Sequence, residues 1–279
     1  MSVSGIVGLF AGKPHHPVGP DGRMALSDHL RELRGRVLKS VTVILVVLIA
    51  SLFFFDQVFE LVLRPYEAAV EQLPDDVASQ ATVAGAGGPL MLYLKLCGLV
   101  SVVLTSPYWL YQIWAFILPG LHDNERRWTR VFAAIAGPLF LAGVTLGYYT
   151  LPKGLELLIG LTPGSLVNLV EFGDYLTFLI RTLLVFGIAF EIPVFVVLLN
   201  LAGVLRGESL GTHRPWVVIG TFVFAAIATP STDPFTMLFL AIPMVALFGI
   251  SEVIARFLDR RRDARSGLTG LSDDEISAL

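Results

Sequence analysis

Long apolar stretches separated by short polar segments dominate the chain. A membrane-spanning helix needs about 20 mostly apolar residues, and six stretches approach that length: 37–55, 89–119, 131–151, 175–202, 215–229 and 235–254. The fifth is shorter than an average bilayer requires, and the turn PSTDP separates it from the sixth. Pro107 removes a backbone donor within the second stretch, which predicts a kink there. The pattern predicts an all-α integral membrane protein with six transmembrane helices, of which the last two are short.

The amino-acid composition agrees with this class of protein. Hydrophobic residues make up 54% of the chain and charged residues 15%, with a mean hydropathy of +0.72, whereas a soluble domain has about a quarter charged residues. The net charge of −3 gives no overall basic character for binding nucleic acid. Cys97, the single cysteine, lies in an apolar stretch and excludes an internal disulfide framework.

The polar segments divide the chain into three parts. Residues 1–23 form a Pro/Gly-rich arm that we expect to be disordered, 24–258 a membrane domain and 259–279 a charged tail. The arm lacks the cationic start and long apolar run of a secretory signal, and translation could begin at Met24. With six spans, the Lys and Arg residues of the connecting segments lie almost entirely on the side of the membrane that holds both termini. Only Arg64 and Lys153 lie on the opposite side. The positive-inside rule therefore predicts cytoplasmic termini.

Sequence motifs for catalysis are missing. The chain has no GxxxxGK[ST] phosphate loop, no GxSxG nucleophile elbow and no HExxH zinc motif. We therefore expect a binding or transport protein without enzymatic activity, and we expect no cofactor and no metal ion.

Two charged residues lie within the fourth apolar stretch, 175–202. Glu191 interrupts the run LLVFGIAFEIPVFVVLL, and a charge at mid-bilayer costs at least about 2.5–3.5 kcal/mol. Arg181 lies ten residues earlier, which in a helix places it roughly 15 Å away and about 80° around the axis. The two therefore cannot form a direct salt bridge within one helix. We expect each to point at another helix, a water-filled groove or a partner protein. The alternatives are an internal polar lock within the bundle and a contact with a partner or substrate.

Two acids lie among the cations next to the membrane. The segment SDHLRELRGR has a helix-start pattern and carries Glu32, which shares a face with Arg36 at i,i+4 spacing. The loop LPGLHDNERRW carries Glu125 beside Arg126 and Arg127. One interpretation is a salt-bridged helix followed by an ordinary positive-inside loop. The other is a site for a ligand with paired guanidinium groups, which carboxylates bind in bidentate fashion.

Four segments in register carry a resemblance to a known family. They are HLRELRGRV before the first span, SPYWLYQIWAFILPGLHDNERR ending the second, FGIAFEIPV in the fourth and ATPSTDPFTMLFLAIPM across the last turn. Over about 24–256 the chain resembles the TatC family, the multispanning receptor subunit of the twin-arginine protein translocase, in an actinobacterium-like form. The resemblance implies a concave bundle of six spans in the bacterial inner membrane, with both termini cytoplasmic.

The resemblance also implies how the protein works and which residues bind a signal peptide. TatC proteins bind the Arg-Arg motif of folded precursors' signal peptides at the cytoplasmic face. They recruit single-span partners of the TatA and TatB type for export driven by the proton gradient. The residues that match the signal-peptide site are Glu32, Leu33, Arg34, Phe116, Glu125, Arg126 and Arg127.

A second set of positions is implied to contact the partners. Glu191 corresponds to the intramembrane acid of the family, Pro65 to a proline in a cap over the groove, and Asp233 to an acid in the last outer turn. Arg181 departs from the family pattern and is a candidate partner for Glu191 in trans. The resemblance further implies a homo-oligomer within a larger complex in the lipid bilayer, and no nucleic-acid partner.

The main alternative is a proton-coupled secondary transporter of a small solute, with Glu191 and Arg181 as its polar site. Such transporters often contain two related halves, and no convincing internal repeat is present. An intramembrane enzyme is a weaker alternative, because no nucleophile–base pair is present. On the third span, Gly143–Gly147 forms a small-xxx-small face, which favours packing inside the chain over an oligomer contact.

Overall fold

The computed structural model describes residues 26–74, 77–117, 125–163, 165–201, 203–229 and 234–269. Within these ranges, the side chains of 26–29, 78, 125–130, 133 and 265–269 are not described. The elements follow in this order: α2 (Leu26–Leu52), α3 (Phe55–Val70), β1 (Ala78–Thr82), α4 (Gly88–Leu104), α5 (Ser106–Ile117), α6 (Glu125–Gly160), β2 (Val167–Glu171), α7 (Phe172–Leu201), α8 (Gly207–Thr212), α9 (Arg214–Ala228) and α10 (Pro234–Thr269).

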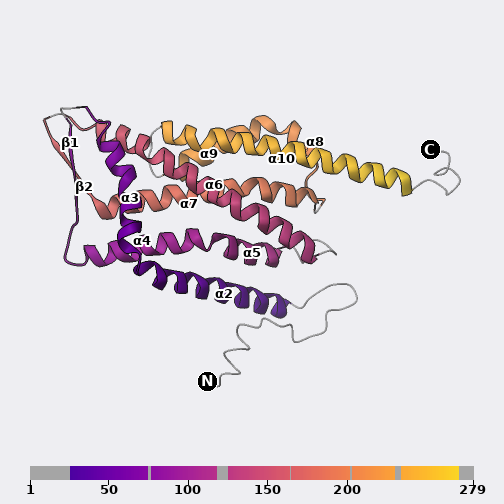
Figure 1. The fold of residues 1–279 in the computed structure, drawn as a ribbon. Coiled ribbons are helices and arrows are strands. Elements are labelled where there is room, and N and C mark those ends of the chain that lie inside the picture. The colour runs from indigo at the N-terminus through magenta and orange to yellow at the C-terminus, as the bar shows by residue number, and fades with distance from the viewer. Residues whose placement is uncertain are drawn as a thin grey trace, which may run out of the picture.

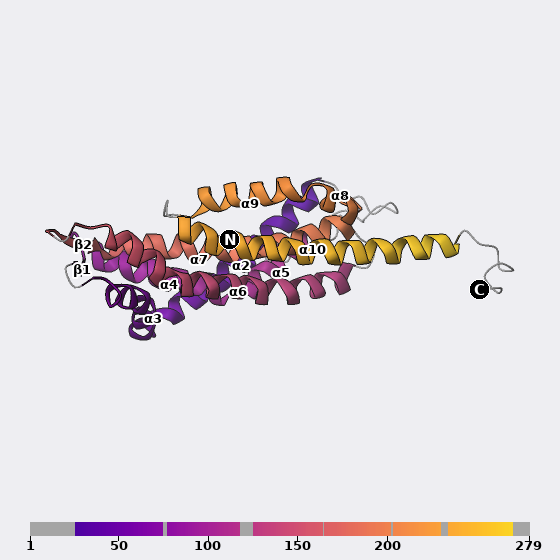
Figure 2. The same cartoon turned by 90° about the horizontal axis from the view of Figure 1, so that it is seen from above.

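The long helices form one bundle whose two ends are built differently (Figure 1). α2, α4 with α5, α6, α7, α9 and α10 run roughly along one direction, whereas α3 crosses them near one end. The strands β1 and β2 lie at that end, which we call the sheet end. α2 begins and α10 ends at the other, the arginine-rich end, which carries Arg34, Arg206, Arg214 and Arg260. Seen from above, α9 and α6 lie on opposite sides of α10 (Figure 2).

The predicted count of six spans is not confirmed. Among the described residues, four helices are long and apolar enough to cross a membrane alone: Leu30–Leu52, Ala134–Gly160, Phe172–Leu201 and Pro234–Ala264. α4 and α5 meet at a bend of 58°, and they add a fifth span if the bent pair is counted as one. This bend, next to Pro107, confirms the predicted kink. α9 has 15 residues and does not pass the same test of length.

The last helix corrects the prediction that both final spans are short. α9 is short, but α10 extends over 36 residues, so the helix continues well beyond the apolar stretch 235–254. The apolar run ends near Leu258, whereas the Arg and Ala residues that follow are good helix formers. The apolar residues mark the part of α10 that can contact lipid, and the helix itself continues beyond them.

Two connections at the sheet end pair as strands, which the all-α prediction missed. β1 and β2 form a two-stranded parallel sheet, with Ala78 opposite Val167 and Thr82 opposite Glu171. β1 reads ASQAT, which contains few strong strand formers. β2 reads VNLVE and alternates in exposure, as strands do. β1 has no such pattern, because it is stabilised by pairing with a segment far away in the sequence.

The first connection at this end contains an amphipathic helix, α3, rather than a plain loop. Val62, Pro65, Tyr66 and Ala69 form its buried face. The hydroxyl of Tyr175 on α7 donates a hydrogen bond to the backbone carbonyl of Val62 at 2.5 Å. α3 is therefore fastened across the end of the bundle by both packing and hydrogen bonding.

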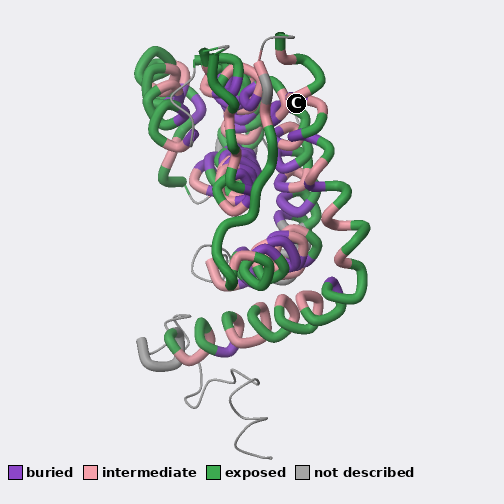
Figure 3. Tube along the Cα trace, turned by 90° about the vertical axis from the view of Figure 1, so that its left-hand side faces the viewer, coloured by how far each residue is buried: buried purple, intermediate pink, exposed green. Residues whose placement is uncertain are grey.

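Small residues let α6 and α7 approach closely in the core. A Cβ on Gly147 would lie 3.1 Å from Phe186 Cβ, and one on Gly187 would lie 2.6 Å from Phe140 Cε2. Both are shorter than the roughly 3.5–4.0 Å at which carbon atoms pack best. Gly143–Gly147 is therefore an internal packing face, as predicted. Buried residues concentrate in the middle of the bundle, and exposed ones at its margins (Figure 3).

Candidate functional site

α2 and α5 enclose a groove near the arginine-rich end, which we call the α2–α5 groove. Its volume is about 450 Å³. Leu33 and Phe116, two residues of the predicted signal-peptide site, line it from α2 and α5 respectively. The rest of the lining is mostly apolar: Arg36, Val37, Ser40, Val41, Ile44, Trp109, Gln112, Ile113 and Ile117. The groove suits an apolar segment that carries polar groups at one end.

Glu32 is connected to this groove through Arg36. The Arg36 guanidinium donates from Nε to Glu32 Oε1 at 2.9 Å, and its Nη2 donates to the same oxygen. Its Nη1 donates to Gln112 Oε1 on α5 at 3.3 Å, which ties α2 to α5. Among the described residues no hydrogen bond reaches Glu32 Oε2. One carboxylate oxygen therefore stays available to a further donor.

The structure tests only part of the predicted signal-peptide site. Arg34 is exposed on α2, and within the described part of the chain its side chain makes no hydrogen bond or ion pair. The backbones of Glu125, Arg126 and Arg127 begin α6, but their side chains lie outside the described residues. The fold thus brings Glu32, through Arg36, to the groove that Leu33 and Phe116 line, and the other carboxylate stays a prediction.

Glu191 lies on α7 with its carboxyl group enclosed by protein. Both carboxyl oxygens are buried, and neither has a hydrogen-bond partner among the described residues. The indole N–H of Trp114 on α5 is near enough to act on this carboxyl, but the pair lacks hydrogen-bonding geometry and Trp114 Nε1 is unpartnered as well. Buried polar groups are normally hydrogen-bonded. Within the described chain, Glu191 and Trp114 are therefore buried polar side chains without a hydrogen-bond partner.

Arg181 lies on another face of α7, and this face is exposed. Asp174, Ile188 and Ile192 share it, because residues separated by about seven or eleven positions lie on one side of a helix. No hydrogen bond or ion pair joins Arg181 to any described side chain. The structure does not bring Arg181 and Glu191 together, which agrees with the separation predicted from helical geometry.

The two remaining predicted residues lie toward the sheet end or beyond the described ranges. Pro65 is buried in α3, which crosses the end of the bundle. Asp233 lies outside the described residues. The structure is thus consistent with Pro65 in a cap, and the role of Asp233 stays a prediction.

Gln112 is the member of this site that sequence reasoning missed. It is 8% exposed and accepts the hydrogen bond from Arg36 that joins the two walls of the groove. A signal was present, since Gln112 is a polar residue within the apolar run SPYWLYQIWAF. Arg36 was noted only as the i,i+4 neighbour of Glu32, and the structure adds its contact across the groove.

Metal binding has no support in the described part of the chain. No group of three or more His, Cys, Asp or Glu side chains there is placed to hold a metal ion. The chemistry that the site does offer is carboxylate acceptance of cationic donors beside an apolar groove.

Comparison with known proteins connects this geometry to one family. The family model described as Sec-independent protein translocase protein (TatC) matches residues 28–243. The Sec-independent protein translocase protein TatC of Frankia casuarinae is 40% identical over 269 residues, which cover 93% of this chain and 74% of that protein. The TatC of Escherichia coli K12 is 34% identical over 233 residues, covering 83% of this chain and 88% of that protein.

A solved structure agrees with these relatives. The crystal structure of the twin-arginine translocase receptor TatC in DDM superposes with a TM-score of 0.67 at 31% identity, covering 81% of this chain and 99% of that chain. Frankia and Corynebacterium, the sources of two similar relatives, are actinobacteria, as the resemblance implied. The chain therefore belongs to the TatC family, a multispanning component of the Sec-independent protein translocase.

Proposed function

We propose that this protein recognises the twin-arginine signal peptides of folded precursor proteins. The observation that carries the proposal is the α2–α5 groove, an apolar channel next to a carboxylate with one oxygen available. An apolar part of the signal peptide would lie along Leu33 and Phe116. A signal-peptide arginine would donate to Glu32 Oε2, because hydrogen bonds between a guanidinium group and a carboxylate are charge-assisted and strong.

Arg36 supports this assignment because it already binds Glu32 in the way that a ligand arginine would. Its guanidinium reaches Glu32 Oε1 with two donors and is held in place by Gln112. A ligand arginine would either use the second oxygen or replace Arg36. Glu125 would supply the carboxylate for the other arginine of the motif.

The intramembrane polar residues are proposed to contact single-span partners of the TatA and TatB type. Arg181 is an exposed charge on the apolar face of α7, and such a charge is costly in lipid unless a partner neutralises it. Glu191 has two buried oxygens that lack partners in the described chain. A polar side chain from a partner helix would satisfy either residue, and Pro65 and Asp233 are proposed as further partner contacts.

The topology follows from the charge distribution. The arginine-rich end would face the cytoplasm by the positive-inside rule, and both termini would then be cytoplasmic. The resemblance to the TatC family implies the bacterial inner membrane. The protein would act with further copies of itself in a larger complex. Transport would be driven by the proton gradient, as the resemblance to the TatC family implies; the missing phosphate loop is consistent with this.

The proposal is tested by crosslinking a radiolabelled twin-arginine precursor to the protein in membrane vesicles. Replacing Glu32 and Glu125 together by Ala should abolish the crosslink while insertion of the protein into the membrane is unchanged. Glu60→Ala is the matched control, because Glu60 forms a similar i,i+4 ion pair with Arg64, at 2.8 Å, in α3. Undiminished crosslinking in the double variant would overturn signal-peptide recognition by these carboxylates.

The alternative of a proton-coupled transporter for a small solute has no support from the comparisons, which identify a protein translocase component. The structure adds a geometric objection. Glu191 and Arg181, the residues of that hypothetical solute site, lie on different faces of α7.

A further inference from the structure

A polar cavity of about 410 Å³ lies at the arginine-rich end, away from the α2–α5 groove. The connection after α7, the short helix α8 and the end of α10 form its walls. Four arginines and three acids line it, so the lining carries an excess of one positive charge: Gly203, Arg206, Glu208, Arg256, Asp259, Arg260, Arg262 and Asp263.

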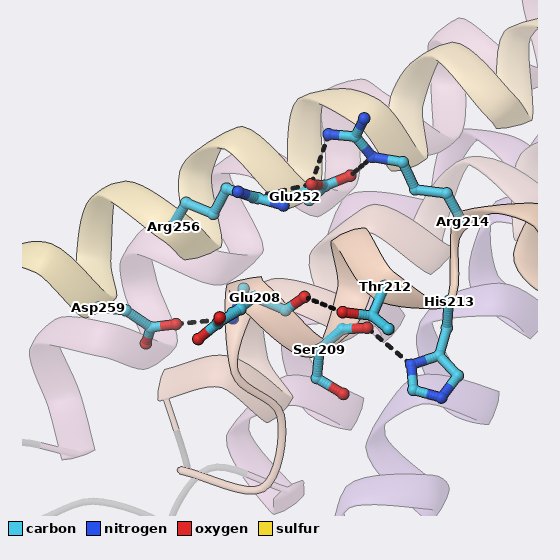
Figure 4. A network of polar contacts seen from close by, with 9 residues as sticks. Glu208, Ser209, Thr212, His213, Arg214, Glu252, Arg256 and Asp259 are labelled. Carbon is cyan, nitrogen blue, oxygen red and sulfur yellow. Dashed lines mark hydrogen bonds and ion pairs between the residues drawn. The ribbon is translucent and has the colours of Figure 1, made fainter.

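One hydrogen bond joins α8 to α10 (Figure 4) and another joins α7 to α10, and both shape this cavity. Asp259 Oδ2 accepts from the backbone N–H of Gly207 at 2.6 Å, and its Oδ1 accepts from Asn200 Nδ2 at 2.9 Å. Gly207 lies so close to α10 that a Cβ there would be 2.6 Å from the backbone nitrogen of Arg256. The carboxylate of Asp259 is therefore occupied in building the wall.

Two of the arginines are also occupied. Arg256 Nε donates to the buried Glu252 at 2.8 Å. Arg262 Nη2 donates to the backbone carbonyl of Leu201 at 3.1 Å, at the end of α7. These contacts hold both guanidinium groups beside the cavity without leaving them free to move.

Arg206 and Arg260 are different. Both are exposed, and neither guanidinium group makes a hydrogen bond or ion pair with any described residue. Glu208 is the acid of the lining whose carboxylate likewise lacks a described partner. Arg206 and Arg260 thus bring two available guanidinium groups to one cavity. Together they form a binding site for an anion with several oxygens, because arginine matches phosphate with two parallel donors.

The position of the cavity along α10 indicates which anion. Ile250, Val253 and Phe257 are 56%, 67% and 53% exposed, so this part of α10 contacts lipid chains. From Asp259 onward the helix is dominated by charged residues. The cavity includes Arg256 and Arg260 and therefore straddles the boundary where phospholipid head groups lie.

We propose that this cavity binds the phosphate group of an anionic glycerophospholipid, with Arg206 and Arg260 as the phosphate ligands. The acyl chains would lie along the exposed apolar side of α10. Bound lipid would fasten the α7–α8 connection to the end of α10. The proposal does not depend on signal-peptide recognition.

The test uses the full-length protein purified in mild detergent and native mass spectrometry with phosphatidylglycerol or phosphatidylcholine of identical acyl chains. We expect selective binding of phosphatidylglycerol, and a loss of about tenfold or more in its affinity when Arg206 and Arg260 are both replaced by Gln. Arg261→Gln is the matched control. Its guanidinium lies 4.4 Å from the centre of the Phe257 ring and does not line the cavity.

The other possible outcomes of the experiment also test the proposal. Equal losses of phosphatidylglycerol affinity in the double variant and in Arg261→Gln would show only a diffuse attraction to positive charge. No loss of affinity in either variant would show that the lipid does not bind at this cavity. Glu208→Gln should strengthen phosphatidylglycerol binding, whereas a weakening would overturn the choice of an anionic head group. Inorganic phosphate should fail to displace the lipid; displacement that depends on Arg206 and Arg260 would identify a free-phosphate site instead.

Because the guanidinium groups of Arg206 and Arg260 make no hydrogen bond or ion pair within the described chain, the double variant should keep the thermal unfolding midpoint of the delipidated protein. Added phosphatidylglycerol should raise that midpoint in the original protein and not in the double variant. An equal rise in both would contradict binding at these residues.

Discussion

Glu252 of α10 and Arg214 of α9 form a two-point ion pair, with Nε to Oε2 at 2.6 Å and Nη2 to Oε1 at 2.7 Å. The Glu252 side chain is 2% exposed, and Arg256 donates to the same Oε1. The pair fastens the first residue of α9 to a residue 38 positions later in the chain. This contact therefore helps to hold the start of α9, a helix of 15 residues, in place beside α10.

Replacing Glu252 by Gln should lower the stability of the protein. The variant leaves Arg214 and Arg256 facing each other without the carboxylate that separates them, and it removes the charge from three hydrogen bonds. We expect the midpoint of thermal unfolding in detergent to fall by several degrees. The matched variant Glu60→Gln breaks an exposed ion pair and should have little effect. Equal shifts would contradict the anchoring role of Glu252.

Replacing Gly187 by Ala should disturb the contact between α6 and α7. The added Cβ would lie 2.6 Å from the ring of Phe140, and overpacking of this kind costs about 1–3 kcal/mol. The stability is measured as fluorescence-detected unfolding in detergent. Gly98→Ala is the control, because a Cβ there meets nothing within 4 Å. Phe140→Leu should partly rescue Gly187→Ala, and a lack of rescue would place the cost elsewhere.

Replacing Glu191 by Leu should separate stability from function. The variant removes two buried oxygens that lack partners among the described residues, so the isolated protein should become more stable by about 1–3 kcal/mol. Co-purification of single-span partners from native membranes should be lost in the same variant. A fall in stability of the isolated protein would show that Glu191 has a structural partner within its own chain.

The two cations within the spans should respond differently to replacement by Leu. Lys95 on α4 donates to the carbonyl of Gly173 at 3.2 Å and to Thr177 Oγ1 at 3.0 Å, so Lys95→Leu should lower stability by about 1–3 kcal/mol. Arg181→Leu removes a charge with no described partner and should leave the isolated protein equally or more stable. Its effect should appear as weaker recovery of partner proteins from native membranes. Similar loss of stability in both variants would contradict the assignment of Arg181 as a partner contact.

Replacing Glu32 by Gln should reduce the preference for arginine in a signal peptide. A charge-assisted hydrogen bond contributes about 1.5–3 kcal/mol, which corresponds to at least about tenfold in the dissociation constant. We expect this loss for a peptide with an Arg-Arg motif and a much smaller one for its Lys-Lys analogue, because lysine cannot make the two-point contact. The dissociation constants are measured by fluorescence anisotropy on the purified protein. An equal loss for both peptides would reduce the role of Glu32 to general charge attraction.

Sequence reasoning succeeded where a contact depends on residues close together in the chain. The i,i+4 spacing predicted that Glu32 and Arg36 share a face, and they form an ion pair. The spacing of Gly143 and Gly147 predicted a packing face, and it receives Phe186 of α7. The motifs around Glu32 and Glu191 were also sufficient to identify the family.

Sequence reasoning failed where stability comes from distant segments or where hydropathy and helix formation diverge. β1 was missed because its pairing partner is β2, on the far side of three helices in the chain. α10 was predicted too short because the apolar run stops before the helix does. The contact of Arg36 with Gln112 joins residues 76 positions apart, and no periodicity connects positions at that distance.

The sequence by itself determined that this chain enters a membrane and that the charges of Glu191 and Arg181 are anomalous there. Lys95, in the apolar stretch 89–119, is a further charge at such a position. Apolar length and the cost of placing a charge in lipid are properties of the residues themselves, so no fold is needed to read them. Only the tertiary structure decided which of these charges is satisfied. Lys95 finds oxygen acceptors on α7, whereas Glu191 and Arg181 find none among the described residues. Hydrogen bonding depends on distances of about 3 Å between helices, and helix packing alone sets those distances.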